Sequence, residues 1–283
     1  MIKATGPVFA LGASGLAFVA ITGCAADEAQ AEQDAASAAV QGPLPDRIEK
    51  GQSFTDDLST FRGKRWYISH GWSNGNYAMN DWQKGQAEFK NGLTLTMGTN
   101  RQSNYPFSSG EVQSRKRHGH GYFETTMRAA KGSGLVSGFF TYNGPAFKKP
   151  WNEIDVEILG AKSDEVQFTV YYHDDKFSHV HKLGFDASEG FHTYGFDWQP
   201  GYIDWYVDGE RVFRATADDI TLPDIPQKIY MNLLGSRTLN RWAGPFDETA
   251  LPATVKCTCS TIPPGSRARA SIWPSRALAK GWS

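Results

Sequence analysis

Cysteine is scarce in this chain, with three in 283 residues. So small and odd a count excludes a dense disulfide framework. An excess of charge of one sign is also missing, because 29 basic residues oppose 30 acidic ones and the formal net charge is −1. This balance excludes a protein that relies on bulk positive charge to hold nucleic acid or anionic lipid. A hydrophobic fraction of 40% also excludes a disordered polyelectrolyte.

Long hydrophobic runs are missing except near the start, where an uncharged stretch extends from Pro7 to Ile21 after Lys3. It is too short and too rich in glycine to span a membrane comfortably, but it has the size of a signal-peptide core. It ends in Ile-Thr-Gly-Cys24, which resembles a bacterial lipobox. The resemblance implies cleavage before Cys24 and lipidation of that cysteine. We therefore expect export and a lipid anchor in the bacterial cell envelope, periplasmic or at the cell surface. The alternative is an ordinary signal peptide and secretion.

Composition divides the chain into four parts. Residues 1–23 form the predicted lipoprotein signal peptide. Residues 24–45 are rich in Ala, Gln, Asp and Glu and lack aromatic side chains, so they predict a flexible linker. Residues 46–262 form the predicted folded domain. Residues 263–283 carry Arg267, Arg269, Arg276 and Lys280 and predict a disordered basic tail without an assigned function.

Helical periodicity is also lacking beyond residue 50, where short alternating runs are bounded instead by Gly, Asn, Asp and Pro. In the clearest hairpin, Asp208-Gly209 separates residues 202–207 from residues 210–213 and favours a type I′ turn. Just upstream, Pro200-Gly201 suits a type II turn. Many short strands without helical connections predict an all-β sandwich of two packed antiparallel sheets, or a jelly roll.

Acidic and apolar residues alternate along residues 153–158, Glu-Ile-Asp-Val-Glu-Ile. Because side chains alternate faces in a strand, Glu153, Asp155 and Glu157 share one face, and the intervening residues share the other. Adjacent carboxylates repel each other and acidic residues are poor strand formers, so folding alone does not require them there. A local violation of folding rules indicates a functional site.

Two carboxylates that flank a glycosidic bond can act as nucleophile and general acid/base. Along an extended strand, the Cα atoms of Glu153 and Glu157 are about 13 Å apart. A retaining mechanism needs carboxyl groups about 5–5.5 Å apart, so both side chains would have to lean inward over a curved strand.

The Glu-Ile-Asp-Val-Glu segment resembles the active-site motif of glycoside hydrolase family 16, in the form without an inserted bulge residue. The likeness is strongest to bacterial lichenases (endo-β-1,3-1,4-glucanases) and exopolysaccharide depolymerases, and it covers roughly residues 50–262. Further family-like segments are residues 71–75, 139–145, 183–188, 190–194, 197–203 and 205–209.

The resemblance implies a concanavalin A-like jelly roll with a concave substrate cleft. It makes Glu153 the nucleophile, Asp155 its helper and Glu157 the general acid/base. Aromatic rings can stack on sugar faces. The positions that match substrate-binding residues of the family are Trp151, Trp72, Asn74, Glu111, Tyr171 and Trp242. For Trp198 and Trp205 we expect core packing instead.

The resemblance fails at several positions. Asn80 and Ser109 stand where lichenases commonly carry a bridging cysteine pair. Gln113 replaces a frequent arginine, Thr169 a substrate-contacting asparagine and Leu234 a cleft tryptophan. A cleft without that ring and amide is open to a specificity other than mixed-linkage glucan.

We predict no metal and no cofactor. The family often holds a structural calcium partly through an aspartate in the last strand, where this chain has Lys256, and a cation is a poor calcium ligand. The histidine pairs lack a nearby cysteine and predict polar sheet-face or loop positions rather than zinc ligands; they are His118 with His120 and His179 with His181, near His173. Cys257 and Cys259 are predicted to face the core together as free thiols.

The sequence thus predicts a monomeric retaining endo-β-glucanase that hydrolyses internal bonds of a mixed-linkage β-1,3-1,4-glucan. Its partner would be a polysaccharide, with no nucleic acid and with membrane contact only through the lipid anchor. One alternative is an exopolysaccharide (succinoglycan-type) depolymerase. Two others are a non-catalytic carbohydrate-binding sandwich and a structural protein whose acidic row holds calcium.

Overall fold

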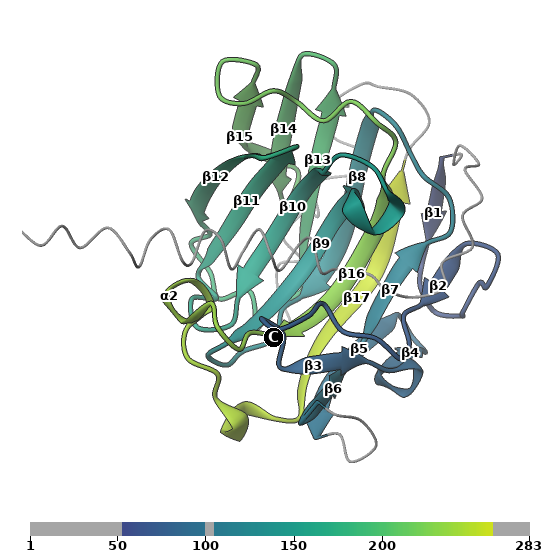
Figure 1. Ribbon diagram of the computed structural model, residues 1–283, viewed down its shortest axis with the longest axis vertical. Helices are drawn as coiled ribbons and strands as arrows, with labels where there is room; N and C mark the ends of the chain where they lie inside the picture. Colours follow the sequence, from purple (N-terminus) through teal and green to yellow (C-terminus); the bar gives the residue numbers. More distant parts are fainter. Residues whose placement is uncertain (1–52, 100–104, 263–283) are drawn as a thin grey trace, which may run out of the picture.

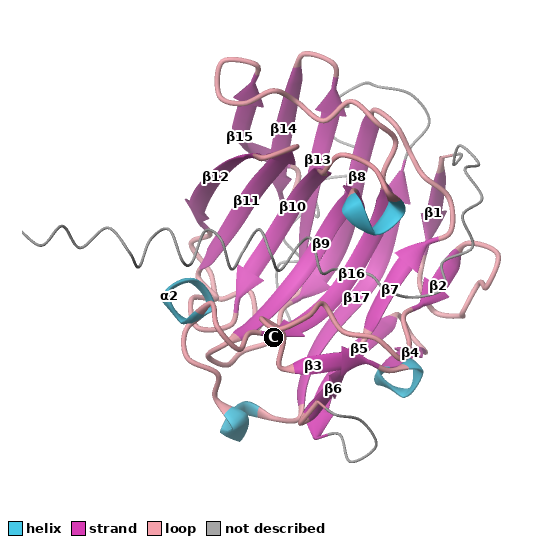
Figure 2. Cartoon of the chain, viewed as in Figure 1, coloured by secondary structure: helices cyan, strands magenta, loops and turns pink. Residues whose placement is uncertain are grey.

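The computed structural model describes residues 53–99 and 105–262, and strands dominate this part of the chain (Figures 1 and 2). They form two sheets, and every pairing is antiparallel except that of β3 with β6. The ten-stranded sheet runs in the order β15 (Glu210–Thr216), β14 (Tyr202–Val207), β13 (His192–Gln199), β8 (Gly121–Arg128), β17 (Ala253–Ile262), β5 (Leu93–Thr99), β6 (Phe107–Ser109) and β3 (Asn80–Trp82), with β1 (Phe54–Asp56) on β17 and β4 (Ala87–Phe89) on β5.

The seven-stranded sheet runs in the order β12 (Asp175–Lys182), β11 (Glu165–Tyr172), β10 (Asn152–Leu159), β9 (Leu135–Asn143), β16 (Lys228–Gly235), β7 (Glu111–Ser114) and β2 (Trp66–Ile68). Helical structure among the described residues is limited to α2 (Asn240–Ala243) and three 3₁₀ turns: η1 (Lys84–Gln86), η2 (Pro145–Phe147) and η3 (Glu248–Ala250). The predicted all-β jelly-roll sandwich is therefore confirmed.

The main core lies between the two sheets, where alternate residues of each strand point inward. On β10, the inward residues Ile154, Val156 and Ile158 are fully buried, as the alternating pattern predicts. Trp198 and Trp205 of the other sheet belong to the same core, which confirms their expected structural role. The Trp205 indole N–H donates to the backbone oxygen of Asp155 at 3.2 Å, so this core side chain reaches the strand that carries the acidic row.

The two predicted hairpin turns differ in outcome. Asp208 and Gly209 have φ values of 49° and 84°, so both adopt the positive φ that a type I′ turn requires. Gly201 does not have a positive φ, so the predicted type II turn is wrong. Gln199 pairs with Tyr202 across this two-residue loop, and a type II turn there would splay strands that must twist together.

The two cysteines of β17 do not face the core together, as the simple alternation predicted. The pairing of β17 with β8 shifts register between Cys257 and Cys259, and this irregularity turns the following residues over. Cys257 is therefore buried in the core, whereas Cys259 is partly exposed and its thiol lies 3.3 Å from the Thr261 hydroxyl. Both thiols are free, as predicted.

Several predictions concern residues outside the described ranges. They concern the signal peptide at residues 1–23, the whole linker at residues 24–45 with Cys24, the start of the predicted domain at residues 46–52, and the basic tail at residues 263–283. Within residues 53–99 and 105–262, no helix is long and apolar enough to cross a membrane.

Candidate active site

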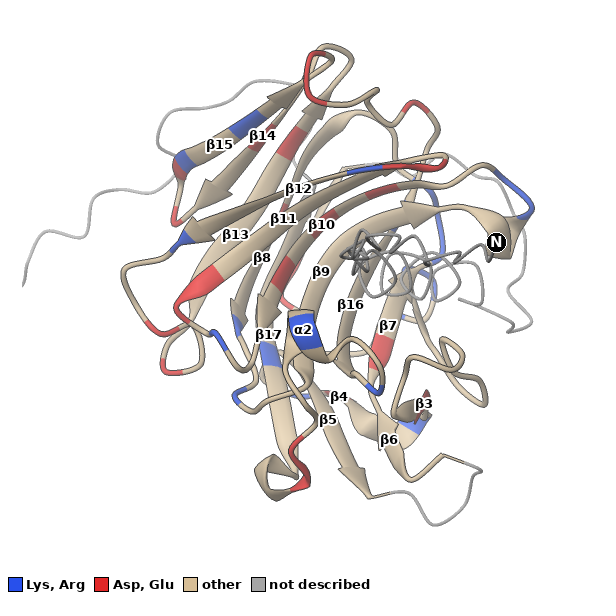
Figure 3. Cartoon of the chain, turned by 60° about the vertical axis from the view of Figure 1, so that its left-hand side comes forward, with Lys and Arg blue, Asp and Glu red and all other residues tan. Residues whose placement is uncertain are grey.

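The acidic row lies on β10, in the seven-stranded sheet between β9 and β11 (Figure 3). Pairing to β9 is continuous from Asn152 to Leu159, and pairing to β11 is continuous from Asn152 to Glu157. No bulge interrupts either ladder, as expected for the form of the motif without an inserted residue. The alternation therefore holds along the whole strand, with acids on one face and core residues on the other.

One pocket on the outer face of this sheet contains all three carboxylates. Its lining comes from β7, β9, β10, β16 and the segment before β3, and comprises Asn74, Tyr77, Glu111, Val136, Phe140, Tyr142, Glu153, Asp155, Glu157, Tyr230, Asn232 and Leu234. The carboxylates are thus neither dispersed to different sides nor sealed under packed side chains. Glu153 and Glu157 are partly exposed, while Asp155 between them is buried.

Cross-strand register determines what lies beside each acid. Glu153 pairs with Tyr142 of β9 and Tyr171 of β11, so rings stand on both sides of it. Glu157 pairs instead with Gly138 and Gln167. A Cβ atom at Gly138 would lie 2.7 Å from the Asn232 side-chain oxygen, so any other residue there would displace that amide from its place beside Glu157.

A tryptophan fixes the Glu153 carboxylate. The Trp151 indole N–H donates to Glu153 Oε2 at 2.5 Å. The indole stacks in parallel on Tyr171, with ring centroids 4.3 Å apart, and the Lys176 ammonium lies 5.3 Å from the Tyr171 ring centroid. Trp151 is almost fully buried, so it holds the carboxylate from behind rather than lining the pocket floor.

Burial raises the pKa of both Glu153 and Asp155, because loss of water disfavours the charged form. Repulsion from Glu157 raises both further. Within the pair, the Asp155–Glu153 hydrogen bond raises the pKa of Asp155 and lowers that of Glu153, which is the pattern of a protonated Asp155 donating to a Glu153 carboxylate. The Trp151 indole and the Lys176 ammonium also favour the charged form of Glu153.

A fourth acid, Glu111 of β7, completes the pocket. It accepts from the Ser69 hydroxyl at 2.7 Å and from the Asn232 amide at 3.2 Å. Burial raises the pKa of Glu111 to about 7, against these two hydrogen bonds that lower it. Asn232 therefore contacts Glu111 on one side and lies against Gly138, beside Glu157, on the other.

The remaining predicted binding residues lie at different depths. Asn74 lines the pocket, donating to the Tyr77 hydroxyl at 3.1 Å and accepting from the Trp82 indole at 2.8 Å. Trp72 packs edge-on against Trp82 behind that loop and is nearly fully buried. Trp242, in α2, donates to the Gln167 side chain at 2.9 Å and so lies near the Glu157 end.

Several pocket residues were not predicted from the sequence, namely Tyr77, Val136, Phe140, Tyr142, Tyr230 and Asn232. Phe140 and Tyr142 belong to the family-like segment before β10 and alternate along it, which is the signal that could have found them. Tyr230 and Asn232 alternate in the same way on β16. Their place beside β9 depends on sheet order, which no local pattern encodes.

The residues that replace typical family residues form hydrogen bonds within the fold. Asn80 accepts from the Gly235 backbone N–H at 2.9 Å, and Ser109 donates to the Leu233 backbone oxygen at 2.5 Å. At the two positions where lichenases commonly carry a cysteine pair, this chain thus has two hydrogen bonds to β16. Thr169 is fully buried, and its hydroxyl contacts Gln167 and Ser178.

Gln113 extends the polar network behind Glu111. It donates to Ser69 at 3.3 Å and accepts from the Lys228 ammonium at 3.2 Å and the Tyr230 hydroxyl at 3.4 Å. Leu234 lines the pocket directly, so an aliphatic side chain occupies the position of the family's tryptophan.

In residues 53–99 and 105–262, no group of three or more His, Cys, Asp or Glu side chains is arranged to hold a metal ion. Lys256 is exposed on β17 and pairs with Arg128 of β8, so two cations stand where the family's calcium ligand was sought. These residues do not fit a calcium ion, and no step of the chemistry is assigned to one.

Comparison with known proteins places this geometry in a family. Residues 74–250 match the family model described as glycosyl hydrolases family 16. A beta-glucanase of Paenibacillus macerans is 42% identical over 199 residues, covering 70% of this chain and 82% of that protein. A beta-glucanase of Acetivibrio thermocellus is also 42% identical, over 69% of this chain, but the match spans only 58% of that protein's length. The structure entitled Bacillus licheniformis beta-glucanase superposes with a TM-score of 0.70 at 35% identity, covering 75% of this chain and 98% of that one. The chain belongs to glycosyl hydrolases family 16.

Proposed function

We propose that this protein is a retaining endo-β-glucanase that cleaves internal bonds of a mixed-linkage β-1,3-1,4-glucan. The observation that carries the proposal is that Glu153, Asp155 and Glu157 all line the same pocket on the outer face of β10. The similarity to proteins named beta-glucanase supports the substrate class.

In this proposal Glu153 is the nucleophile. Its carboxylate attacks the anomeric carbon while protonated Glu157 gives its proton to the departing glycosidic oxygen, which leaves a covalent glycosyl-enzyme. Glu157, now ionised, then removes a proton from water as the water attacks the same carbon and releases Glu153. Two displacements at one carbon retain its configuration. Asp155 keeps a proton and donates it in a hydrogen bond, so Glu153 can carry the reactive charge next to another carboxylate.

The predicted binding residues flank this centre. Glu111 and Asn74 line the pocket and can hydrogen-bond to sugar hydroxyl groups. Tyr171 and Trp242 stand near opposite ends of the acidic row. Trp242 can offer its ring to a sugar face, whereas one face of the Tyr171 ring is covered by Trp151. Trp151 and Trp72 lie deeper, so we assign them to positioning Glu153 and the Asn74 loop.

Carboxylate-to-amide variants test the assignment. Glu153→Gln or Glu157→Gln should abolish cleavage of lichenan while the melting temperature changes little, because the amide has the same shape as the carboxyl group. Glu124→Gln, on β8 of the other sheet, is the matched control and should cleave at the native rate. Full activity in either pocket variant would overturn the proposal.

The substrate is tested by product analysis on lichenan, laminarin, xyloglucan and a bacterial exopolysaccharide. We expect lichenan to be cleaved best. Cleavage of laminarin alone would contradict the mixed-linkage assignment, and cleavage of the exopolysaccharide alone would establish the depolymerase alternative. Binding of glucan without release of reducing ends would identify a non-catalytic carbohydrate-binding sandwich.

We also propose that the protein is exported as a monomer and anchored by a lipid on Cys24. The hydrophobic run followed by Ile-Thr-Gly-Cys24 supports this location. Metabolic labelling with a fatty-acid analogue in a bacterial host should mark the native chain, and Cys24→Ser should remove the label. Equal labelling of both chains would refute lipidation at this residue.

A further inference from the structure

The loop between β1 and β2 carries an aromatic and basic segment, Phe61-Arg62-Gly63-Lys64-Arg65. The first four of these residues are exposed, and Phe61 is 44% exposed, which makes it one of the few large apolar side chains at the described surface. In Figure 1 the loop lies beside β1 and β2, at the side of the molecule opposite α2. A docking surface here would leave the pocket on β10 open.

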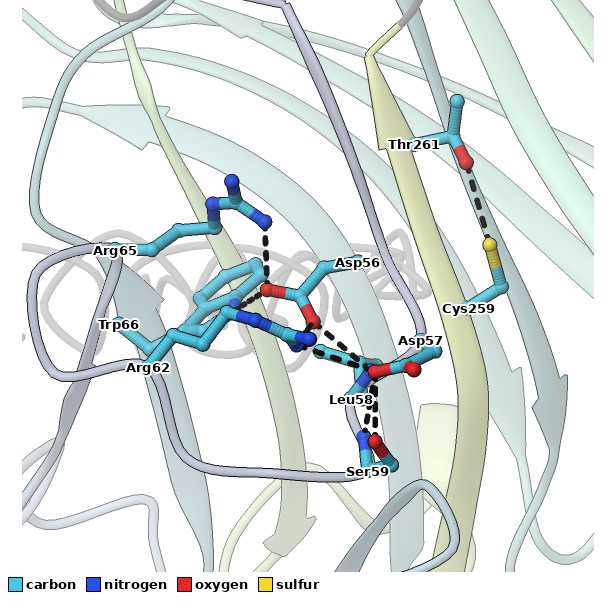
Figure 4. A network of polar contacts seen from close by, with 9 residues as sticks. All are labelled: Asp56, Asp57, Leu58, Ser59, Arg62, Arg65, Trp66, Cys259 and Thr261. Carbon is cyan, nitrogen blue, oxygen red and sulfur yellow. Dashed lines mark hydrogen bonds and ion pairs between the residues drawn. The ribbon is translucent and has the colours of Figure 1, made fainter.

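Ion pairs to a buried aspartate fix this loop to the fold (Figure 4). Asp56 is buried and accepts from Arg65 at 2.7 Å, from the Trp66 indole at 3.1 Å and from Arg62. Arg65 also stacks over the Phe54 ring at 4.1 Å. The loop is therefore a preformed shape rather than a loose chain, and its basic side chains are presented together.

A cavity of about 500 Å³ opens beneath the loop. Arg62, Lys64, Arg65 and Lys116 line it together with His118, and its described lining includes no acidic side chain. Burial and the nearby charges of Arg65 and Lys116 lower the pKa of His118 to about 4, so the histidine stays neutral while the surrounding cations remain. Arg62 and Arg65 are already paired with Asp56, so Lys64 and Lys116 are the side chains through which this cavity attracts anions.

We propose that this basic cavity and the exposed Phe61 form a docking site for the phosphate groups of an anionic lipid bilayer. Arginine and lysine hydrogen-bond to phosphate, and an aromatic ring beside them suits the interface between headgroups and acyl chains. Because the net charge of the whole chain is close to zero, the chain as a whole does not attract anionic lipid. Attraction to such a bilayer therefore requires a local basic surface.

The position of the site favours a membrane over a soluble anion. Ser53, where the described chain begins, lines the same cavity. It follows the proposed lipidated Cys24 by 29 residues, so the domain would be joined to the anchor at this end. A lipid anchor would thus hold this side of the fold near the bilayer. This step rests on the proposed anchor, whereas the chemistry of the basic cavity does not.

Vesicle sedimentation of the full chain carrying Cys24→Ser tests the site without a lipid anchor. We expect binding to vesicles of equal parts phosphatidylcholine and phosphatidylglycerol, weaker binding at high ionic strength, and little binding to phosphatidylcholine alone. Each lysine near an anionic surface contributes about fivefold to binding. Adding Lys64→Glu and Lys116→Glu should therefore weaken binding by at least about twentyfold.

Lys162→Glu with Lys256→Glu is the matched control, because it changes total charge equally on exposed residues away from the cavity. It should retain most of the binding, and Phe61→Ser should weaken binding without a change of charge. Equal binding by the cavity variant and the control, or equal binding to both kinds of vesicle, would overturn the proposal. Binding of an acidic polysaccharide but not of vesicles would overturn the membrane assignment. Lichenan cleavage, measured separately, should be native in every variant, so failure here is distinguishable from failure of the proposed enzyme activity.

Discussion

Replacement of Trp151 by phenylalanine isolates one hydrogen bond to the proposed nucleophile. The variant keeps a ring that can stack on Tyr171, but it loses the indole N–H that donates to Glu153 at 2.5 Å. A hydrogen bond to a charged group contributes about 1.5–3 kcal/mol. Since 1.36 kcal/mol corresponds to one pH unit, the pKa of Glu153 should rise by about 1 to 2 pH units.

The sign of the effect follows from the proposed role of Glu153 as nucleophile. The nucleophile must be ionised, so a higher pKa reduces its active fraction at acidic pH. The acid limb of kcat/KM against pH, which reports groups of the free enzyme, should move to higher pH by the same amount. At a pH well below the native limb, kcat/KM should fall about ten- to hundredfold, and the difference should shrink as pH rises.

The assay is a pair of pH profiles on lichenan, with Trp198→Phe as control. Trp198 also loses an indole bond in that variant, to the Pro223 carbonyl at 2.9 Å, but it lies in the core between the sheets. The control should lower the melting temperature and leave the acid limb in place. An unchanged acid limb in Trp151→Phe, or an equal shift in both variants, would refute the reasoning.

Two further predictions concern stability. Burial raises the pKa of Glu111 from 4.5 to about 7, so folding favours its protonated form and its contribution to stability is lost as pH rises from about 4.5 to 7. The melting temperature of the native protein should therefore fall relative to that of Glu111→Gln across this range, and parallel curves would contradict the assigned burial cost. Asn80→Ala leaves the buried Gly235 N–H unpaired and should cost about 1–3 kcal/mol. Calorimetry should show a melting temperature lower by about 3–10 °C, whereas an unchanged value would mean that the bond contributes nothing.

Local patterns predicted the strand that matters most. The alternation of Glu153, Asp155 and Glu157 with apolar residues correctly predicted that the three acids share one face, because side-chain direction in a strand depends only on position along it. Asp208-Gly209 likewise determined its own turn. These features require no knowledge of what packs nearby.

Local sequence patterns did not predict the structural features that depend on neighbouring strands. The bulge before Cys259 arises in the pairing of β17 with β8, and the contacts of Tyr230 depend on β16 lying beside β9. The bond from Trp151 to Glu153 is local in sequence but needs an indole turned toward the carboxylate, a rotamer that Tyr171 fixes by stacking. Sheet order and side-chain rotamers are set by tertiary packing, so the sequence near each residue does not specify them.

The two faces of β10 have a consequence for how this protein tolerates changes in chain length. Unless a β-bulge absorbs it, one residue added or removed within Asn152–Leu159 would exchange the faces of every position beyond it, sending a carboxylate into the hydrophobic interior and an isoleucine into the pocket. The preceding turn around η2 has no such constraint. Its exposed residues 145 and 148–150 lie outside the strands, so they do not alternate between a core face and a pocket face. Natural or engineered indels should therefore accumulate in that turn, where they can reshape the rim of the pocket, and should occur in the strand only where a β-bulge absorbs the added residue.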